Sequence, residues 1–178
     1  IQAAIADADD AGVVLVAAAG NEAFNVNEIP AYPACYDGVI GVGATWLLAG
    51  IIEIPAYFSN YGTDCVDIAA PGVDIYSTLY TDDPTYGFTV DYDYASGTSM
   101  ASPMVAGLAA LILAQDPTLS NNDVATYIVN SADDHSFLTP EYSGRRINAF
   151  TAVSAFESGV DAPTDLHAWS DITHGGCP

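Results

Sequence analysis

Apolar residues along this chain alternate between short runs typical of buried strands and longer stretches typical of helices. The runs at 13–19 and 39–44 are apolar at nearly every position, as in strands covered on both faces of a parallel sheet. The stretch at 105–114 has the composition of a buried helix, and residues 1–11 read as a helix that Gly12 ends. This alternation predicts an α/β fold with a mostly parallel sheet.

Weaker signals lie between these elements. The long apolar stretch after the second strand is expected to form a surface hairpin, with residues 46–51 pairing with residues 52–58. Residues 65–69 are expected to form a short strand, and residues 81–94, rich in Asp and Tyr, a loop.

The carboxyl-terminal third of the chain contains two further helix signals. Ser120 and Asp123 have the spacing of a capping box, which would open a helix that continues to about Ser131. A last short helix is expected at 148–156. No strand or helix signal follows, so the sequence predicts one domain at 1–157 and a linker-like tail at 158–178.

The chain is strongly acidic. Its 178 residues include 23 acids and two arginines, which give a formal net charge of −21. Such a surface repels phosphate backbones and anionic lipids, so nucleic acids and membranes are disfavoured as partners. Two interpretations stay open: a secreted surface that resists aggregation, or adaptation to a salty medium in which screening relieves self-repulsion.

The most informative segment is 97–107, which reads Gly-Thr-Ser-Met-Ala-Ser-Pro-Met-Val-Ala-Gly. It places Ser99 after a flexible turn and Pro103 near the start of a helix. A hydroxyl at the start of a buried helix lies beside unpaired N–H groups, which favour developing negative charge and therefore suit a nucleophile. Taken alone, a Gly-x-Ser sequence at this position favours an ordinary capped core helix.

The same segment resembles the active-serine motif of the subtilases, the subtilisin-like serine peptidases. It departs from that motif only at Met104, where the family usually has a non-catalytic histidine. Further segments resemble the family in its order: 16–22, 39–45, 58–62 and 67–72. The resemblance covers about residues 1–157 and implies the carboxyl-terminal part of a three-layer α/β fold.

The resemblance implies a serine endopeptidase that acts on polypeptide substrates. Ser99 would attack the peptide carbonyl to form an acyl-enzyme, and Asn21 would donate its side-chain amide to the oxyanion. Glu22, at the rim of the specificity pocket, would favour a basic substrate side chain. The pocket itself would be lined by small residues: Ala17, Ala18, Ala19, Gly20 and Ala31.

Two family motifs are missing from this sequence. Asp-[Ser/Thr]-Gly and His-Gly-Thr-His supply the other two members of the triad, and both belong before Asn21. The three histidines, His135, His167 and His174, all follow Ser99. Because a serine without a base is a weak nucleophile, we expect this chain alone to be inactive and to require a missing amino-terminal half of the catalytic domain.

Two other functions were weighed against this one. A non-catalytic, subtilase-derived binding or scaffold module remains an alternative, although such a module has no physical need to keep Ser99, Asn21 and the glycine motifs together. A serine hydrolase with a nucleophile elbow is excluded, because that turn needs glycine where Ala101 stands.

The three cysteines are an odd number. The resemblance implies a disulfide between Cys35 and Cys65, as in some secreted subtilases, and hence an extracellular location; two buried free thiols are the alternative. Cys177 is left over. The chemistry requires no cofactor. Structural calcium is an expectation for the loop that carries Asp82, Asp83, Asp91 and Asp93, with a solvated acidic loop as the alternative.

Overall fold

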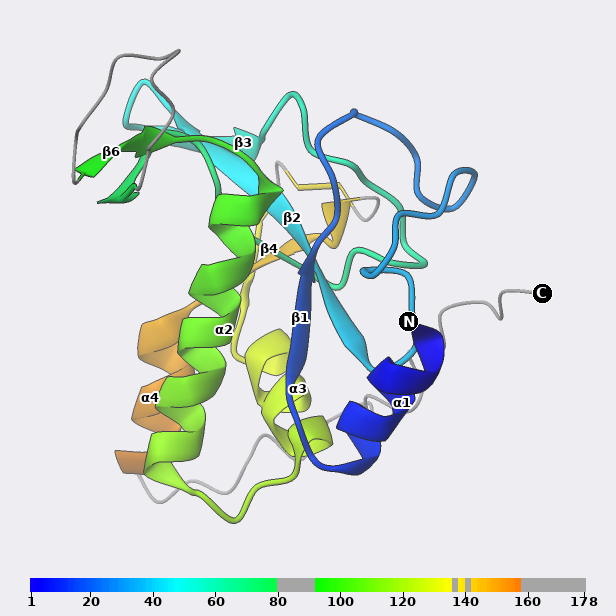
Figure 1. The fold of residues 1–178 in the computed structure, drawn as a ribbon. Helices are drawn as coiled ribbons and strands as arrows, with labels where there is room; N and C mark the ends of the chain where they lie inside the picture. The colour runs from blue at the N-terminus through cyan, green and yellow to red at the C-terminus, as the bar shows by residue number, and fades with distance from the viewer. Residues whose placement is uncertain (80–91, 136–137, 140–141, 158–178) are drawn as a thin grey trace.

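The computed structural model describes residues 1–79, 92–135, 138–139 and 142–157, whose elements are shown in Figure 1. Its centre is a six-stranded sheet in the order β1-β2-β4-β8-β7, with β3 paired to β2. The parallel strands are β1 (Leu15–Ala18), β2 (Val39–Leu48), β4 (Ile68–Pro71) and β8 (Arg145–Arg146). Antiparallel strands extend it at β3 (Ile52–Pro55) and β7 (Asp133–Asp134). This is the mostly parallel α/β fold that the sequence predicts.

The helices lie where the sequence predicts them. The longest, α2 (Thr98–Gln115), runs along the sheet and packs against β1, β2 and β4 (Figure 1). Both α3 (Asn121–Asn130) and α4 (Ala149–Glu157) pack against α2, and α1 (Gln2–Asp10) contacts β1. The main core fills the space between sheet and helices with fully buried side chains: Ile40, Val42, Ile68, Val105, Leu108, Ile112, Val124 and Ile128.

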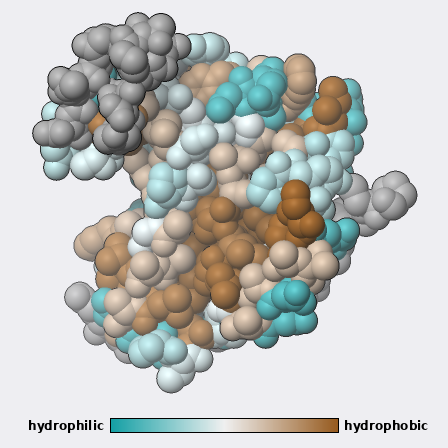
Figure 2. All heavy atoms as spheres, viewed as in Figure 1, coloured by the Kyte–Doolittle hydropathy of each residue, from teal (hydrophilic) through white to brown (hydrophobic). Residues whose placement is uncertain are grey.

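The described residues cover α2 on one side only, whereas the sequence predicted a buried helix. Val105, Leu108 and Ile112 face the core, while the opposite face is exposed and consists of Ser99, Pro103, Ala106, Gly107, Ala110, Leu111 and Ala114. Figure 2 shows a broad hydrophobic area over β1 and the adjoining part of α2. By length and composition α2 could also cross a membrane, a property common among core helices.

The predicted hairpin is present, with shorter strands than expected. Residues Thr45 to Leu48 of β2 pair with Ile52 to Pro55 of β3, and Leu47, Leu48 and Ile51 are exposed near the turn. Glu53 ties this hairpin to the sheet, because its carboxylate accepts hydrogen bonds from the Thr45 hydroxyl and from Arg146 Nε, the latter at 3.0 Å.

Two local expectations differ from the structure, and two short strands were not predicted. Residues 92–94, expected in a loop, belong to β6 (Tyr92–Ala95), which pairs with β5 (Ile75–Thr78). Pairing with a neighbouring strand overrides the loop-like composition of β6. The strand expected at 65–69 is β4 and begins at Ile68. Two short strands, β7 and β8, were missed because two residues are too few to show a period.

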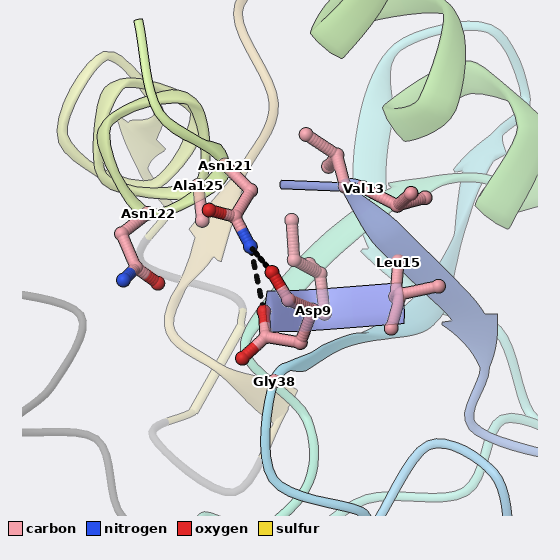
Figure 3. Close-up of a pocket in the computed structure, with 9 residues that line it drawn as sticks. Asp9, Val13, Leu15, Gly38, Asn121, Asn122 and Ala125 are labelled. Atoms are coloured by element: carbon pink, nitrogen blue, oxygen red, sulfur yellow. Dashed lines mark hydrogen bonds between the residues drawn. The ribbon is translucent and has the colours of Figure 1, made fainter. Parts of the chain in front are cut away.

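A polar junction joins α1 to the start of α3. The Asn121 side-chain amide donates to Asp9 Oδ1 at 2.6 Å and to the Asp9 carbonyl at 3.1 Å (Figure 3). The predicted capping box is formed, with the Ser120 hydroxyl accepting from the Asp123 N–H and the Asp123 carboxylate accepting from the Ser120 N–H. The cavity beside this junction measures only about 10 Å³ and has room for a single water at most.

We expect the isolated chain to self-associate at micromolar concentration. In the described part of the chain, β1 pairs on one edge only and the outer face of α2 is apolar, and both features promote association. Light scattering should detect oligomers, and Leu111→Lys, which puts a charge on that face, should reduce them.

Phe150→Lys is the matched control, since Phe150 is an exposed apolar residue on α4. It should leave the association unchanged. A compact monomer of the unmodified chain that does not bind the hydrophobic dye ANS would contradict the prediction.

Candidate active site

The turn before α2 presents Ser99 to solvent at the carboxyl ends of the central strands. The Gly97 N–H donates to the Gly72 carbonyl at 2.7 Å, and the Asp74 N–H donates to Ser96 Oγ at 2.9 Å. A Cβ on Gly72 would collide with Ala44 and the Gly97 carbonyl, so glycine is what permits this close approach. The turn is therefore anchored to the segment after β4, and Ser99 is exposed in the first turn of α2.

Asn21 lies next to this turn because Thr98 joins the two segments. Thr98 is fully buried, and its N–H and hydroxyl both donate to Asn21 Oδ1, at 2.8 and 3.0 Å. The Thr98 hydroxyl oxygen in turn accepts from the Gly20 N–H at 3.1 Å. These bonds occupy the oxygen of the Asn21 amide and thereby leave its NH₂ group to donate elsewhere.

The Asn21 NH₂ and the Ser99 N–H border the same small space. A Cβ built on Gly97 would stand 3.6 Å from both Asn21 Nδ2 and the Ser99 nitrogen. Within the described ranges neither donor has a protein acceptor. The Ser99 N–H belongs to the first turn of α2, where the helix dipole adds positive potential. An oxyanion hole requires two such donors near one point.

The residues predicted to line the specificity pocket separate into two groups. The side chains of Ala17 and Ala19 are buried, at 7% and 0% exposure, and therefore face the protein interior. Ala18, Gly20 and Ala31 are partly exposed. Ala31 packs against the cluster that contains Ala19, so the structure brings these two segments together.

The Glu22 carboxylate accepts hydrogen bonds from within the protein. Its Oε2 accepts from the Asn21 N–H and from Asn60 Nδ2, each at 2.9 Å.

Cys35 and Cys65 form a disulfide with their Cα atoms 4.8 Å apart, within the cluster that contains Ala19. This bond links the loop before β2 to the loop before β4.

Neither a triad histidine nor a metal cluster is found in the described ranges. His135 follows β7, at the opposite edge of the sheet from β1, and its Nε2 lies 4.0 Å from Glu53 Oε2. His167, His174, Cys177 and three of the four calcium candidates, Asp82, Asp83 and Asp91, lie outside the described residues. Asp93 is on β6, where its Oδ1 accepts from the Tyr94 N–H at 2.7 Å; the described residues contain no group of three potential metal ligands.

A mostly apolar hollow of about 130 Å³ lies beside the first turns of α2. The β5–β6 hairpin forms one wall and α2 the other, with Met100 and Pro103 among the lining residues. Pro103 also belongs to the exposed face of α2, so the hollow adjoins the hydrophobic area of that helix.

Sequence reasoning missed two residues that build the site. Thr98 was noted only as part of the serine motif, although it orients the Asn21 amide. Asn60 was noted only within the family segment 58–62, yet it is 2% exposed and bonds repeatedly to the Asn21 loop. The signal in the sequence was Asn60 itself, because an amide in a buried segment needs hydrogen-bond partners.

Comparison with known proteins gives consistent matches. A thermophilic serine proteinase of Bacillus sp. (strain AK1) is 43% identical over 143 residues, which make up 80% of this chain and 31% of that protein. A halolysin-like extracellular serine protease, Nep, of Natrialba magadii is 38% identical over 143 residues, covering 80% of this chain and 24% of that protein.

The fold agrees with a solved structure. A structure described as proteases from Pseudoalteromonas arctica PAMC 21717 matches with a TM-score of 0.72 and 29% identity, over 87% of this chain and 46% of that one. The chain therefore spans less than half the length of each of these relatives. The sequence profile described as the Subtilase family matches residues 1–159. This chain belongs to the subtilase family.

Proposed function

We propose that this chain is the carboxyl-terminal part of a secreted serine endopeptidase that hydrolyses polypeptides through an acyl-enzyme on Ser99. The observation that carries the proposal is the pair of donors, Asn21 Nδ2 and the Ser99 N–H, which border one space beside Gly97. The hydrogen bonds from Thr98 support it, because they orient the Asn21 amide before any substrate binds.

The proposed reaction follows from this geometry. The Ser99 hydroxyl loses its proton to a base and attacks the substrate carbonyl carbon, so that negative charge develops on the carbonyl oxygen. That oxygen is stabilised by the two donors. As the tetrahedral intermediate collapses, the protonated base gives its proton to the amide nitrogen, the C–N bond breaks, and the amine leaves with the acyl group remaining on Ser99. Water then attacks the acyl group and releases the second product. Ala18, Gly20 and Ala31 are proposed to contact the substrate side chain.

We propose that the base and its aspartate come from an amino-terminal half of the domain that packs on the exposed face of α2. Three observations support this partner: the edge of β1 that no described strand pairs with, the apolar outer face of α2, and the greater length of the relatives. A strand added to β1 and a helix laid on α2 would cover both surfaces.

The alternative function, a non-catalytic binding or scaffold module, needs none of the oriented polar groups at the start of α2. The two hydrogen bonds from Thr98 fix the orientation of the exposed Asn21 amide and leave its NH₂ group free to donate, which suits the reaction and is not needed by a scaffold. The geometry therefore favours the peptidase.

The protein is proposed to act outside the cell, in a medium where salt screens its surface. The Cys35–Cys65 disulfide suits an oxidising compartment, and the net charge of −21 suits a high ionic strength. The relative named as halolysin-like and extracellular is consistent with both. Structural calcium in the 81–94 segment remains part of the proposal.

The proposal predicts that the isolated chain does not react with a fluorophosphonate probe. Without a base the Ser99 hydroxyl keeps its proton, and triad members act as a unit. The chain joined to the segment that carries the Asp and His motifs should be labelled at Ser99, as mass spectrometry can show. Ser99→Ala should abolish this labelling.

Rapid stoichiometric labelling of the isolated chain would contradict the prediction, since it would require a base within the chain. A joined protein that folds but stays unlabelled would favour the scaffold alternative.

Kinetics of the joined enzyme should separate Ser99 from Asn21. Ser99→Ala removes the covalent route and should reduce hydrolysis of a chromogenic peptide to near background. Asn21→Ala removes a hydrogen bond made mainly in the transition state, so kcat should fall about a hundredfold or more while KM changes little. Met104→His restores the residue usual in the family and is the control, expected to leave kcat nearly unchanged. A raised KM with unchanged kcat in Asn21→Ala would exclude the oxyanion role.

The acidic surface predicts that salt stabilises the fold. Raising NaCl from about 0.1 M to about 1 M shortens the Debye length from about 10 Å to about 3 Å and so reduces repulsion among the carboxylates. The midpoint of thermal unfolding, followed by circular dichroism, should rise by several degrees. Sucrose at the same osmolality is the control for excluded-solute effects and should stabilise the protein less. An equal rise in sucrose, or none in NaCl, would contradict the electrostatic explanation.

A further inference from the structure

Asn60 lies beneath the loop that carries Asn21 and bonds to it through every side-chain polar atom. Its Oδ1 accepts from the Glu22 N–H at 3.1 Å and from the Phe24 N–H at 2.9 Å. Its Nδ2 donates to the Ala19 carbonyl and to Glu22 Oε2, both at 2.9 Å. With an exposure of 2%, this amide is buried and its hydrogen-bonding capacity is fully used.

These bonds hold the backbone on both sides of Asn21. On the amino-terminal side, the Asn60 N–H donates to the Gly20 carbonyl at 3.0 Å. On the carboxyl-terminal side, Asn60 holds the Glu22 N–H and carboxylate, and that carboxylate accepts from the Asn21 N–H at 2.9 Å. Asn21 itself is exposed, so its position depends on its neighbours.

Gly20 makes this arrangement possible. It has a φ of 106°, which is in the region that favours glycine, and a Cβ at this position would collide with the Asn60 amide. The loop therefore wraps directly over Asn60, with backbone in contact with side chain.

We infer that Asn60 is a positioning residue for the reaction, because it fixes the loop from Ala19 to Phe24 so that the Asn21 amide meets the oxyanion. This inference rests on the proposed function and adds a residue that acts through Asn21. Thr98 orients the Asn21 side chain from the α2 side, and Asn60 holds the Asn21 backbone from below. A donor displaced by about 1 Å can cost about a hundredfold in rate.

The test is a double-mutant cycle in the joined enzyme that carries the Asp and His motifs. Asn60→Ala should lower kcat at least tenfold with little change in KM. In the Asn21→Ala background the same substitution should change kcat less than threefold, because the group that Asn60 positions is already gone. Equal fold-losses in the two backgrounds, or an unchanged kcat in Asn60→Ala, would overturn the inference.

A second pair of variants covers the possibility that Asn60→Ala does not fold. Asn60→Asp keeps the acceptor for the Glu22 and Phe24 N–H groups but turns a carboxylate oxygen toward the Glu22 carboxylate. It should lower kcat, and adding Glu22→Gln, which removes the negative charge that faces Asp at position 60, should recover part of the loss. No recovery in a folded double variant would overturn the inference.

Asn121→Ala is the matched control. Asn121 also donates two side-chain hydrogen bonds, to Asp9, but it lies at the α1–α3 junction. It should lower the unfolding midpoint without changing kcat; a matching fall in kcat would show that general loosening explains the Asn60 result.

The outcome also separates this inference from the proposed function. If wild-type hydrolysis does not depend on Ser99, the proposed function fails and the inference fails with it. If hydrolysis depends on Ser99 and Asn21 but not on Asn60, only the inference is lost.

Discussion

The hydrogen bonds between Thr98 and Asn21 are the contact on which the site depends. They join the loop after β1 to the start of α2, two segments separated by 77 residues in the sequence. Both donors come from Thr98, which is fully buried and held by the helix that follows it. The same residue that begins α2 therefore also sets the orientation of the Asn21 amide.

Small residues allow the strands and loops around this contact to approach closely. A Cβ on Gly41 would collide with the Cys65 carbonyl, and one on Gly72 would collide with Ala44. The disulfide adds a covalent link between the loops on either side of Gly41. Asn60, five residues before Cys65, bonds from this closely packed region to the exposed loop of Asn21. Close packing beneath the loop thus helps to fix the position of the exposed Asn21.

The elements with strong local signals were predictable from the sequence. The capping box of Ser120 and Asp123 begins α3, and the apolar runs form β1 and β2, because these patterns act over a few neighbouring residues. The β5–β6 hairpin was not predictable, because its strands are polar and depend on pairing with each other. Nor was the role of Asn60, whose hydrogen bonds reach residues 36 to 41 positions away. The exposed face of α2 was also missed, since its composition is that of a buried helix.

Both arginines form ion pairs within the fold, away from the residues proposed for the chemistry. The two arginines, which are the chain's full complement of Lys and Arg, lie in β8, where Arg146 binds Glu53 and Arg145 lies 3.5 Å from Asp134. They are thus far along the sheet from β1 and the Asn21 loop. Among the described residues, the two donors that lie near Gly97, an amide and a helix N–H, are both neutral. Such donors act at hydrogen-bond distance, where salt has little influence, whereas repulsion among surface carboxylates acts over longer distances and is screened. A high ionic strength can thus reduce the repulsion among surface carboxylates and leave the hydrogen bonds of these two donors almost unchanged.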